Sequence, residues 1–252
     1  MTPTRLRLFV LFAVVSAAVF VRLGIWQLHR LGERRARNTV ISDRLREAER
    51  DAGSLAFTDT TGIRFRRVRV TGTPDYDHEL ILAARSHKGA PGVNLLTPVR
   101  LAGRDTAVLV NRGWVYAADG ATIDEERFRE RDSVFVGYAE VYPSPTGTTY
   151  AGKPKILARL GADAAARAIP YPIALFYVVE LGDSTGAADR AARLTVPPLD
   201  EGPHAGYAVQ WFAFAAIAIA GAAFVVKQSR DGGGKRAPSR VRDASAESDA
   251  SG

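Results

Sequence analysis

The sequence predicts an α+β membrane protein in which two transmembrane helices flank a β-rich domain outside the cytoplasm. Three observations lead to this fold class: an apolar run near the N-terminus, a longer one near the C-terminus, and short alternating segments between them. Apolar residues make up 46% of the 252 residues, which is enough for a folded core besides the two spans. We expect the domain to be an antiparallel sheet or a small barrel.

The first span is predicted over residues 6–28. Residues 8–21 carry no charge, and the wider range reaches the length of about 20 residues that a bilayer requires. Arg7 and Arg22 fall near its ends, where an arginine side chain can reach the headgroups. A basic start followed by small residues also suits a cleaved signal peptide, which is the alternative. We favour a retained anchor preceded by a cytoplasmic segment, residues 1–5.

The second span is predicted over residues 206–227, because residues 207–226 contain no charge. Six basic residues follow it, and the positive-inside rule then places the C-terminus in the cytoplasm. The arginines after the first span argue for the reverse orientation, but long translocated domains often override such charges. We therefore expect a multi-pass protein of the plasma (inner) membrane, with both termini cytoplasmic and residues 29–205 periplasmic or otherwise extracytoplasmic. Residues 228–252, rich in Gly, Ser and charge, are expected to be disordered.

Between the spans, changes in hydrophobic period predict the elements of the domain. Apolar residues at helical spacing predict a helix over residues 30–50, and an alanine-rich stretch predicts another over residues 162–168. Alternating or apolar runs bounded by Gly, Pro, Asn and Asp predict the strands. These are residues 67–70, 79–84, 93–101, 106–116, 134–142 and 173–181.

Composition excludes several kinds of chemistry. The net charge of +7 is concentrated beside the two apolar segments, so it suits membrane lipids rather than nucleic acid. The chain has no cysteine and a single methionine, Met1, which argues against redox thiols and a copper-delivery site. Its four histidines form no HxH or HExxH pair, and no nucleophile motif is present. We expect no dedicated zinc site and no enzymatic activity.

Four segments, taken in order, resemble the Surfeit locus protein 1 family, whose members are cytochrome c oxidase assembly factors. They are Leu23–Arg30 (LGIWQLHR), Arg66–Gly72 (RRVRVTG), the block from Gly89 to Pro98 continued by Leu109–Val115 (LVNRGWV), and His204–Phe214 (HAGYAVQWFAF). Two features depart from the family pattern. Tyr116 stands where the family usually has proline, and no Asn-Pro-rich loop is evident between Thr148 and Ala166.

The resemblance implies a role in placing heme a into oxidase subunit I. It implies His204 as the heme iron ligand, and Tyr207 and Trp211 would share its helix face and flank the porphyrin. The implied partners are subunit I, membrane lipids and, as a further candidate, heme A synthase. The alternatives are a heme-independent scaffold that stabilises nascent subunit I and a membrane-tethered hydrolase. The absence of a nucleophile–base pattern argues against the hydrolase.

The other candidate residues have structural or partner-binding interpretations. Gly24, Trp26, Gln27 and Arg30 belong to the first motif. Gln27 and Gln210 are expected either to hydrogen-bond the two helices together or to contact lipid headgroups. Trp26, with Tyr207 and Trp211, also suits an interfacial aromatic belt. His29 is left open as a second iron ligand. Gly72 and Gly113 are expected at a turn or bulge, and Asn111, Arg112 and Trp114 at the same bend or at a docking surface.

Overall fold

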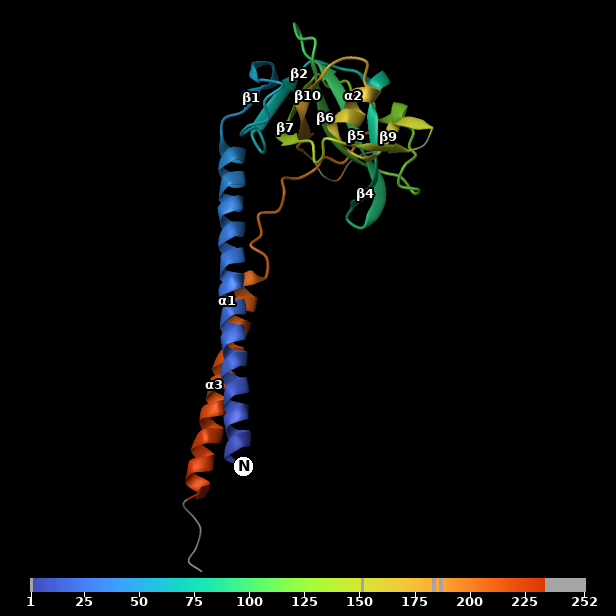
Figure 1. Ribbon diagram of the computed structural model, residues 1–252. Coiled ribbons are helices and arrows are strands. Elements are labelled where there is room, and N and C mark those ends of the chain that lie inside the picture. Colours follow the sequence, from blue (N-terminus) through green and yellow to red (C-terminus); the bar gives the residue numbers. More distant parts are fainter. Residues whose placement is uncertain (1, 151, 183–184, 186–187, 234–252) are drawn as a thin grey trace, which may run out of the picture. The chain divides into compact units, whose positions relative to one another are not determined.

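The computed structural model describes all residues except 1, 151, 183–184, 186–187 and 234–252 (Figure 1). The chain divides into two compact units. One consists of residues 1–36 and 201–252, and the other of residues 37–200. Each unit is described separately below.

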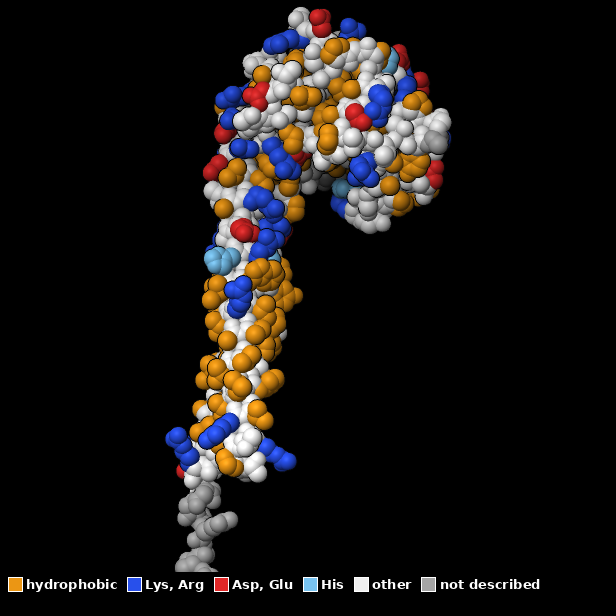
Figure 2. All heavy atoms as spheres, viewed as in Figure 1, with side chains coloured by type: hydrophobic (Ala, Val, Ile, Leu, Met, Phe, Trp, Pro, Cys, Tyr) orange, Lys and Arg blue, Asp and Glu red, His pale blue; other side chains and the backbone are white. Residues whose placement is uncertain are grey.

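The first unit is a pair of long helices that lie side by side (Figure 1): α1 (Pro3–Arg46), of which residues 37–46 belong to the second unit, and α3 (His204–Gly233). Both are long and apolar enough to cross a membrane, and only 17% and 11% of their most apolar windows are buried. Hydrophobic side chains cover the pair between its charged ends (Figure 2). Such exposure is unlike that of a core helix in a soluble protein.

The two helices pack through a stripe of small residues. On α1 the buried positions are Ala13, Ala17, Gly24, Gln27 and Leu31, and on α3 they are Ala208, Ala215 and Ala222. Steps of three, four and seven residues are the period of a coiled-coil seam. Phe20 of α1 contacts Trp211 and Phe214 of α3, while Gln27 contacts His204, so the helices are antiparallel. Alanine and glycine in the seam let the two backbones approach closely.

The second unit is built on one ten-stranded sheet, ordered β1-β2-β7-β10-β6-β5-β4-β9-β8, with β3 paired to β5. Its elements in chain order are β1 (Arg50–Asp51), η1 (Ala52–Ser54), β2 (Arg67–Thr71), β3 (Thr73–Pro74), η2 (Tyr76–His78), β4 (Leu80–His87), β5 (Ala90–Arg100), β6 (Ala107–Tyr116), η3 (Glu125–Phe128), β7 (Val134–Val141), β8 (Thr148–Tyr150), β9 (Lys153–Arg159), α2 (Ala162–Ala168) and β10 (Ile173–Glu180).

The sheet is mixed, so the expectation of an antiparallel sheet is wrong. Strands β1 and β2, β4 and β9, and β6 and β10 pair in parallel, and the other ladders are antiparallel. The central parallel pair arises because the late strand β10 returns to the centre of the sheet, between β6 and β7, instead of adding to an edge. Its sequence, IALFYVVE, is an almost continuous apolar run, as is typical of a central strand covered on both faces.

Apolar clusters cover both faces of the sheet. One face carries Val68, Val110 and Phe176 under Phe57 and Ile63. On the other face, α2 covers Leu82 and Leu109, while Ile41 and Leu45 at the end of α1 pack near Tyr138 and Val179. The helix expected over residues 30–50 is therefore the last part of α1 rather than a separate element.

The six strands predicted from the sequence are present, and α2 has the predicted bounds. Strands β1, β3, β8 and β9 were not predicted. The first three are only two or three residues long, and β9 is mostly exposed, so none has an alternating apolar pattern. Residues 228–233 of the expected disordered tail are helical, and the rest of that tail lies outside the described residues.

Candidate functional site

His204, at the start of α3, is joined to α1 by a hydrogen bond. Its Nδ1 lies 2.9 Å from Oε1 of Gln27, which is only 8% exposed in the helix seam. An amide oxygen can only accept, so Nδ1 carries the proton and donates it to Gln27. The unprotonated nitrogen of a neutral imidazole is then Nε2. The site therefore presents His204 with a fixed ring orientation and a ligand nitrogen that is not used in this bond.

The aromatic neighbours of His204 lie on different sides of α3. Trp211 turns towards α1 and stacks on Phe20, with ring centroids 5.7 Å apart and planes inclined by 24°. Tyr207 is 47% exposed and lies away from the seam. His204 and Trp211 both contact α1, whereas Tyr207, about 60° around the helix from His204, is exposed beside them rather than in the seam.

The first motif on α1 has one structural and several exposed members. A Cβ atom on Gly24 would lie 2.8 Å from the ring of Phe212, so this glycine makes room for an aromatic side chain of α3. Trp26 is 53% exposed, and Arg30 pairs with Glu33 on the same helix at 2.8 Å. Of the two glutamines expected to join the helices, Gln27 does so through its bond to His204, whereas Gln210 is exposed on α3.

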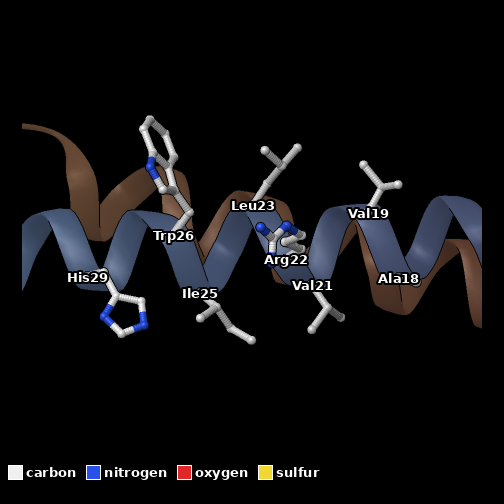
Figure 3. A pocket seen from close by; sticks show the side chains of 8 residues that line it. All are labelled: Ala18, Val19, Val21, Arg22, Leu23, Ile25, Trp26 and His29. Carbon is white, nitrogen blue, oxygen red and sulfur yellow. The ribbon is translucent and has the colours of Figure 1, made fainter.

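A shallow groove runs along the opposite face of α1, with Arg22 at its centre and α3 behind the helix in this view (Figure 3). On one side of it project Val19, Leu23 and Trp26, and on the other Val21, Ile25 and His29 (Figure 3). Two residues correspond to about 200° around a helix, so His29 and Gln27 point in nearly opposite directions. The geometry therefore does not bring His29 to the Nε2 atom of His204, and a shared iron between them is disfavoured.

In the sheet unit, the predicted bend lies at Gly113 of β6. This residue has φ +125°, and a Cβ atom there would lie 2.2 Å from the carbonyl oxygen of Ala192. The side chain of Asn111 accepts a hydrogen bond from the Gly113 backbone N–H at 3.2 Å, as the bend interpretation expected. Trp114, partly buried, lies beside His87 with ring centroids 5.2 Å apart. These residues therefore hold a β-bulge.

Arg112 has a different role from the one expected. Its side chain is fully buried, with Nε 2.6 Å from Thr97 Oγ1 and Nη1 2.9 Å from Glu130, and it also donates to Glu79. Arg193 completes this ion cluster by bonding Glu130 and, at 2.7 Å, the carbonyl oxygen of Arg112. With no exposed area, Arg112 cannot itself contact a partner. It joins β6 to the segments around Glu79, Glu130 and Arg193.

The ion cluster changes the titration of its carboxyl groups. Burial would raise the pKa of Glu130, but the hydrogen bond and charge of Arg193, with Arg112 and Arg190, outweigh it and lower that pKa. Burial raises the pKa of Glu180 to about 7, against the opposing charge of Arg193. Arg193 Nε lies 3.1 Å from Glu180 Oε2, but that oxygen accepts no hydrogen bond from the described residues, which leaves the carboxylate poorly stabilised.

Gly72 is required by close packing. It follows β2, and a Cβ atom would lie 2.3 Å from the backbone oxygen of Arg100, too close for any side chain. Its φ is not positive, so packing rather than backbone conformation sets the requirement. Gly72 thus lies at the bend between β2 and β3, where the backbone of Arg100 leaves no room for a Cβ atom.

Sequence reasoning missed Glu79, Glu130, Glu180 and Arg193. One signal was available: Glu79 and Glu180 adjoin strongly apolar strand sequences, where a charged side chain needs a buried partner. The identity of the partners follows only from the sheet order. Within the described part of the chain, no cluster of three or more His, Asp or Glu side chains could hold a metal ion.

Comparison with known proteins agrees with the resemblance of the four motifs. No match is found among curated protein sequences. Residues 14–216, which include most of α1, the whole sheet unit and the first part of α3, match the SURF1 family. Because this match covers well over half of the chain, the protein belongs to the SURF1 family, the Surfeit locus protein 1 family of cytochrome c oxidase assembly factors.

Proposed function

We propose that this protein is an assembly factor of cytochrome c oxidase that binds heme a through His204 and assists its insertion into subunit I. The observation that carries the proposal is the His204–Gln27 hydrogen bond, which orients the imidazole through Nδ1 and leaves Nε2 outside that bond. Heme a would supply an iron whose axial position a neutral imidazole can fill. Family membership gives the assembly role, and the histidine gives the heme-binding role.

The residues around His204 suit such a group. The chain has no cysteine and no internal methionine, so histidine is the expected protein ligand. His204 is partly exposed at the end of α3, and the exposed face of Tyr207 lies one turn further along. The ring of Trp211 stacks on Phe20 in the contact between the two helices, so Trp211 is not proposed as a porphyrin contact. A single protein ligand is compatible with later release to subunit I.

We further propose that α1 and α3 are transmembrane helices of the inner membrane, with both termini cytoplasmic and the sheet unit extracytoplasmic. Support comes from their length, their exposed apolar surfaces and the basic residues after residue 226. His204 then lies at the outer end of a span, where a lipid-soluble heme would arrive. Heme A synthase is a candidate donor in this arrangement, and subunit I is the acceptor.

The test is the heme absorption band of the full chain, purified in detergent from cells that make heme a. We expect a band in the wild-type protein that His204→Ala removes without lowering the amount of inserted protein. The matched controls are His29→Ala, on the opposite face of α1, and His78→Ala, in the sheet unit, and both should keep the band.

Two results would contradict the proposal in different ways. A band that persists in the His204 variant would reject this residue as the ligand. Wild-type protein without heme, from cells whose oxidase assembly depends on it, would favour the heme-independent scaffold. Loss of oxidase heme a on deleting the gene would support the assembly role in either case.

A further inference from the structure

A second candidate site lies within the sheet unit, far along the sequence from His204. It is a cavity of about 310 Å³ on the sheet face that α2 and the end of α1 partly cover. We call it the sheet cavity. Strands β4, β5, β6, β7 and β10 all contribute to it, together with Arg159 at the end of β9 and Leu194. Neither the assembly role nor the buried ion cluster uses it.

Two buried amides open into the sheet cavity without sufficient partners. Asn94 is 8% exposed, and its side chain makes no hydrogen bond with the described residues. Asn111 is 4% exposed. Its oxygen accepts from the Gly113 N–H, while its NH₂ group has no partner in the described part of the chain. The unpaired amide atoms are not among the fully enclosed polar atoms that lack a partner in the described residues, so they are open to the cavity and can bond water or a bound molecule there.

The other polar groups of the cavity are mostly donors. Arg85 uses only Nε, which donates to the carbonyl oxygen of Ala83 at 3.0 Å, so its terminal nitrogens are not used among the described residues. The side chain of Arg159 makes no ion pair or hydrogen bond within the described ranges. The hydroxyls of Tyr138 and Tyr177 likewise have no hydrogen-bond partner in the part of the chain that the structure covers.

The one carboxylate of the lining is already engaged. Glu140 pairs with Arg64 and accepts a hydrogen bond from the Val141 N–H at 2.9 Å. Both of these contacts are made by Oε1 of Glu140. The lining therefore holds two guanidinium groups, two amides and two hydroxyls against one carboxylate, whose charge is paired with Arg64. Guanidinium groups form their strongest hydrogen bonds with carboxylate and phosphate oxygens.

From this excess of donors we propose that the sheet cavity binds a small soluble molecule bearing a carboxylate or phosphate group. Asn94 and Asn111 on the sheet would bind its oxygens directly, and Arg85 and Arg159 would supply the countercharge. A volume of about 310 Å³ suits a compact metabolite and lies at the lower end of the range for ligand pockets, roughly 300–1,000 Å³. This proposal does not depend on heme binding.

The test is isothermal titration of the full chain in detergent with inorganic phosphate and, separately, with succinate. Sodium chloride at matched ionic strength is the blank. We expect saturable binding of at least one anion, and the two titrations decide between a phosphate and a carboxylate ligand. Binding of neither anion would overturn the proposal and leave water as the occupant of the cavity.

Three variants locate the binding. Asn94→Asp keeps the shape of the side chain but adds a negative charge, and Arg159→Gln removes an exposed positive charge, so it should not disturb folding. Each should raise Kd about tenfold or more. The matched control is Arg131→Gln, an exposed arginine outside the cavity lining, which should change Kd less than about twofold.

An equal change in Kd for Arg159→Gln and Arg131→Gln would show non-specific charge attraction and reject the site. If Asn94→Asp fails to fold, the comparison of the two arginine variants still decides the question.

Discussion

Replacing Arg112 by methionine should destabilise the sheet unit severely, although this residue contacts no solvent. The substitution removes the charge at the centre of the ion cluster and puts an apolar side chain of similar length in its place. Glu130 retains Arg193 and Arg190 as partners after the change. Glu79, only 1% exposed, is left with Thr97 alone. The cost is therefore expected to arise mainly at Glu79.

Breaking a buried ion pair by removing one partner typically costs about 3–5 kcal/mol, because the remaining charge is neither paired nor solvated. The full burial of both Arg112 and Glu79 places this variant within that range. A second change, Glu79→Gln, removes the stranded charge and leaves a side chain that can still bond Thr97. Made in the Arg112→Met background, it should recover about 1 kcal/mol or more.

The assay is guanidinium-induced unfolding of the full chain in detergent, followed by circular dichroism of the sheet. Arg131→Met, a substitution of an exposed arginine, is the matched control and should change stability by less than about 0.5 kcal/mol. A loss below about 1 kcal/mol in Arg112→Met, or no recovery in the double variant, would refute the account of the cluster as an electrostatic core. Normal stability with lost oxidase assembly would restore the docking interpretation.

Three further predictions follow from the geometry. Gly72→Ala should cost about 1–3 kcal/mol or prevent folding, since its Cβ atom would overlap a backbone oxygen, and unfolding measurements check this. The pKa of Glu180 is raised to about 7, so its carboxyl group binds a proton more tightly in the folded state than in the unfolded state. This group therefore lowers the stability of the fold as pH rises from about 4.5 to 7. Glu180→Gln should remove that part of the measured pH dependence. Ala17→Cys with Ala215→Cys should cross-link on mild oxidation, while Ala18→Cys, exposed on another face of α1, with the same partner should not.

The number and type of secondary-structure elements could be predicted where the hydrophobic period of the sequence matches the pattern of buried residues. The strand of residues 67–71 alternates because one of its faces is buried, and the apolar run of residues 173–180 reflects cover on both faces. The parallel pairing of that run with β6 was not predictable, because strand order depends on long-range contacts that leave no local pattern. The same limit applies to Arg112, since a buried and an exposed arginine look alike in a sequence until their neighbours are known.

At the candidate site, the sequence pointed to His204 but not to its partner. Gln27 and Gln210 were both polar residues in apolar surroundings, and both were expected either to join the helices or to contact lipid headgroups. The seven-residue period of the seam decides between these roles: it turns Gln27 inward towards α3 while Gln210 falls two residues after the buried Ala208 and faces outward. The missing information was the relative register of two helices separated by more than 170 residues.

The His204–Gln27 bond has a consequence for both folding and function. A seam of alanine and glycine allows several registers of similar energy, because small apolar side chains interlock weakly. A polar pair within such a seam is satisfied in one register only, as with a buried asparagine in a coiled coil. The hydrogen bond that orients the His204 imidazole thus also fixes the register of α3 relative to α1. A change at Gln27 would therefore disturb both the tautomer of His204 and the register of the helix pair. His204→Ala removes the proposed ligand but keeps the many apolar contacts that hold the two helices together, so it tests the ligand role separately.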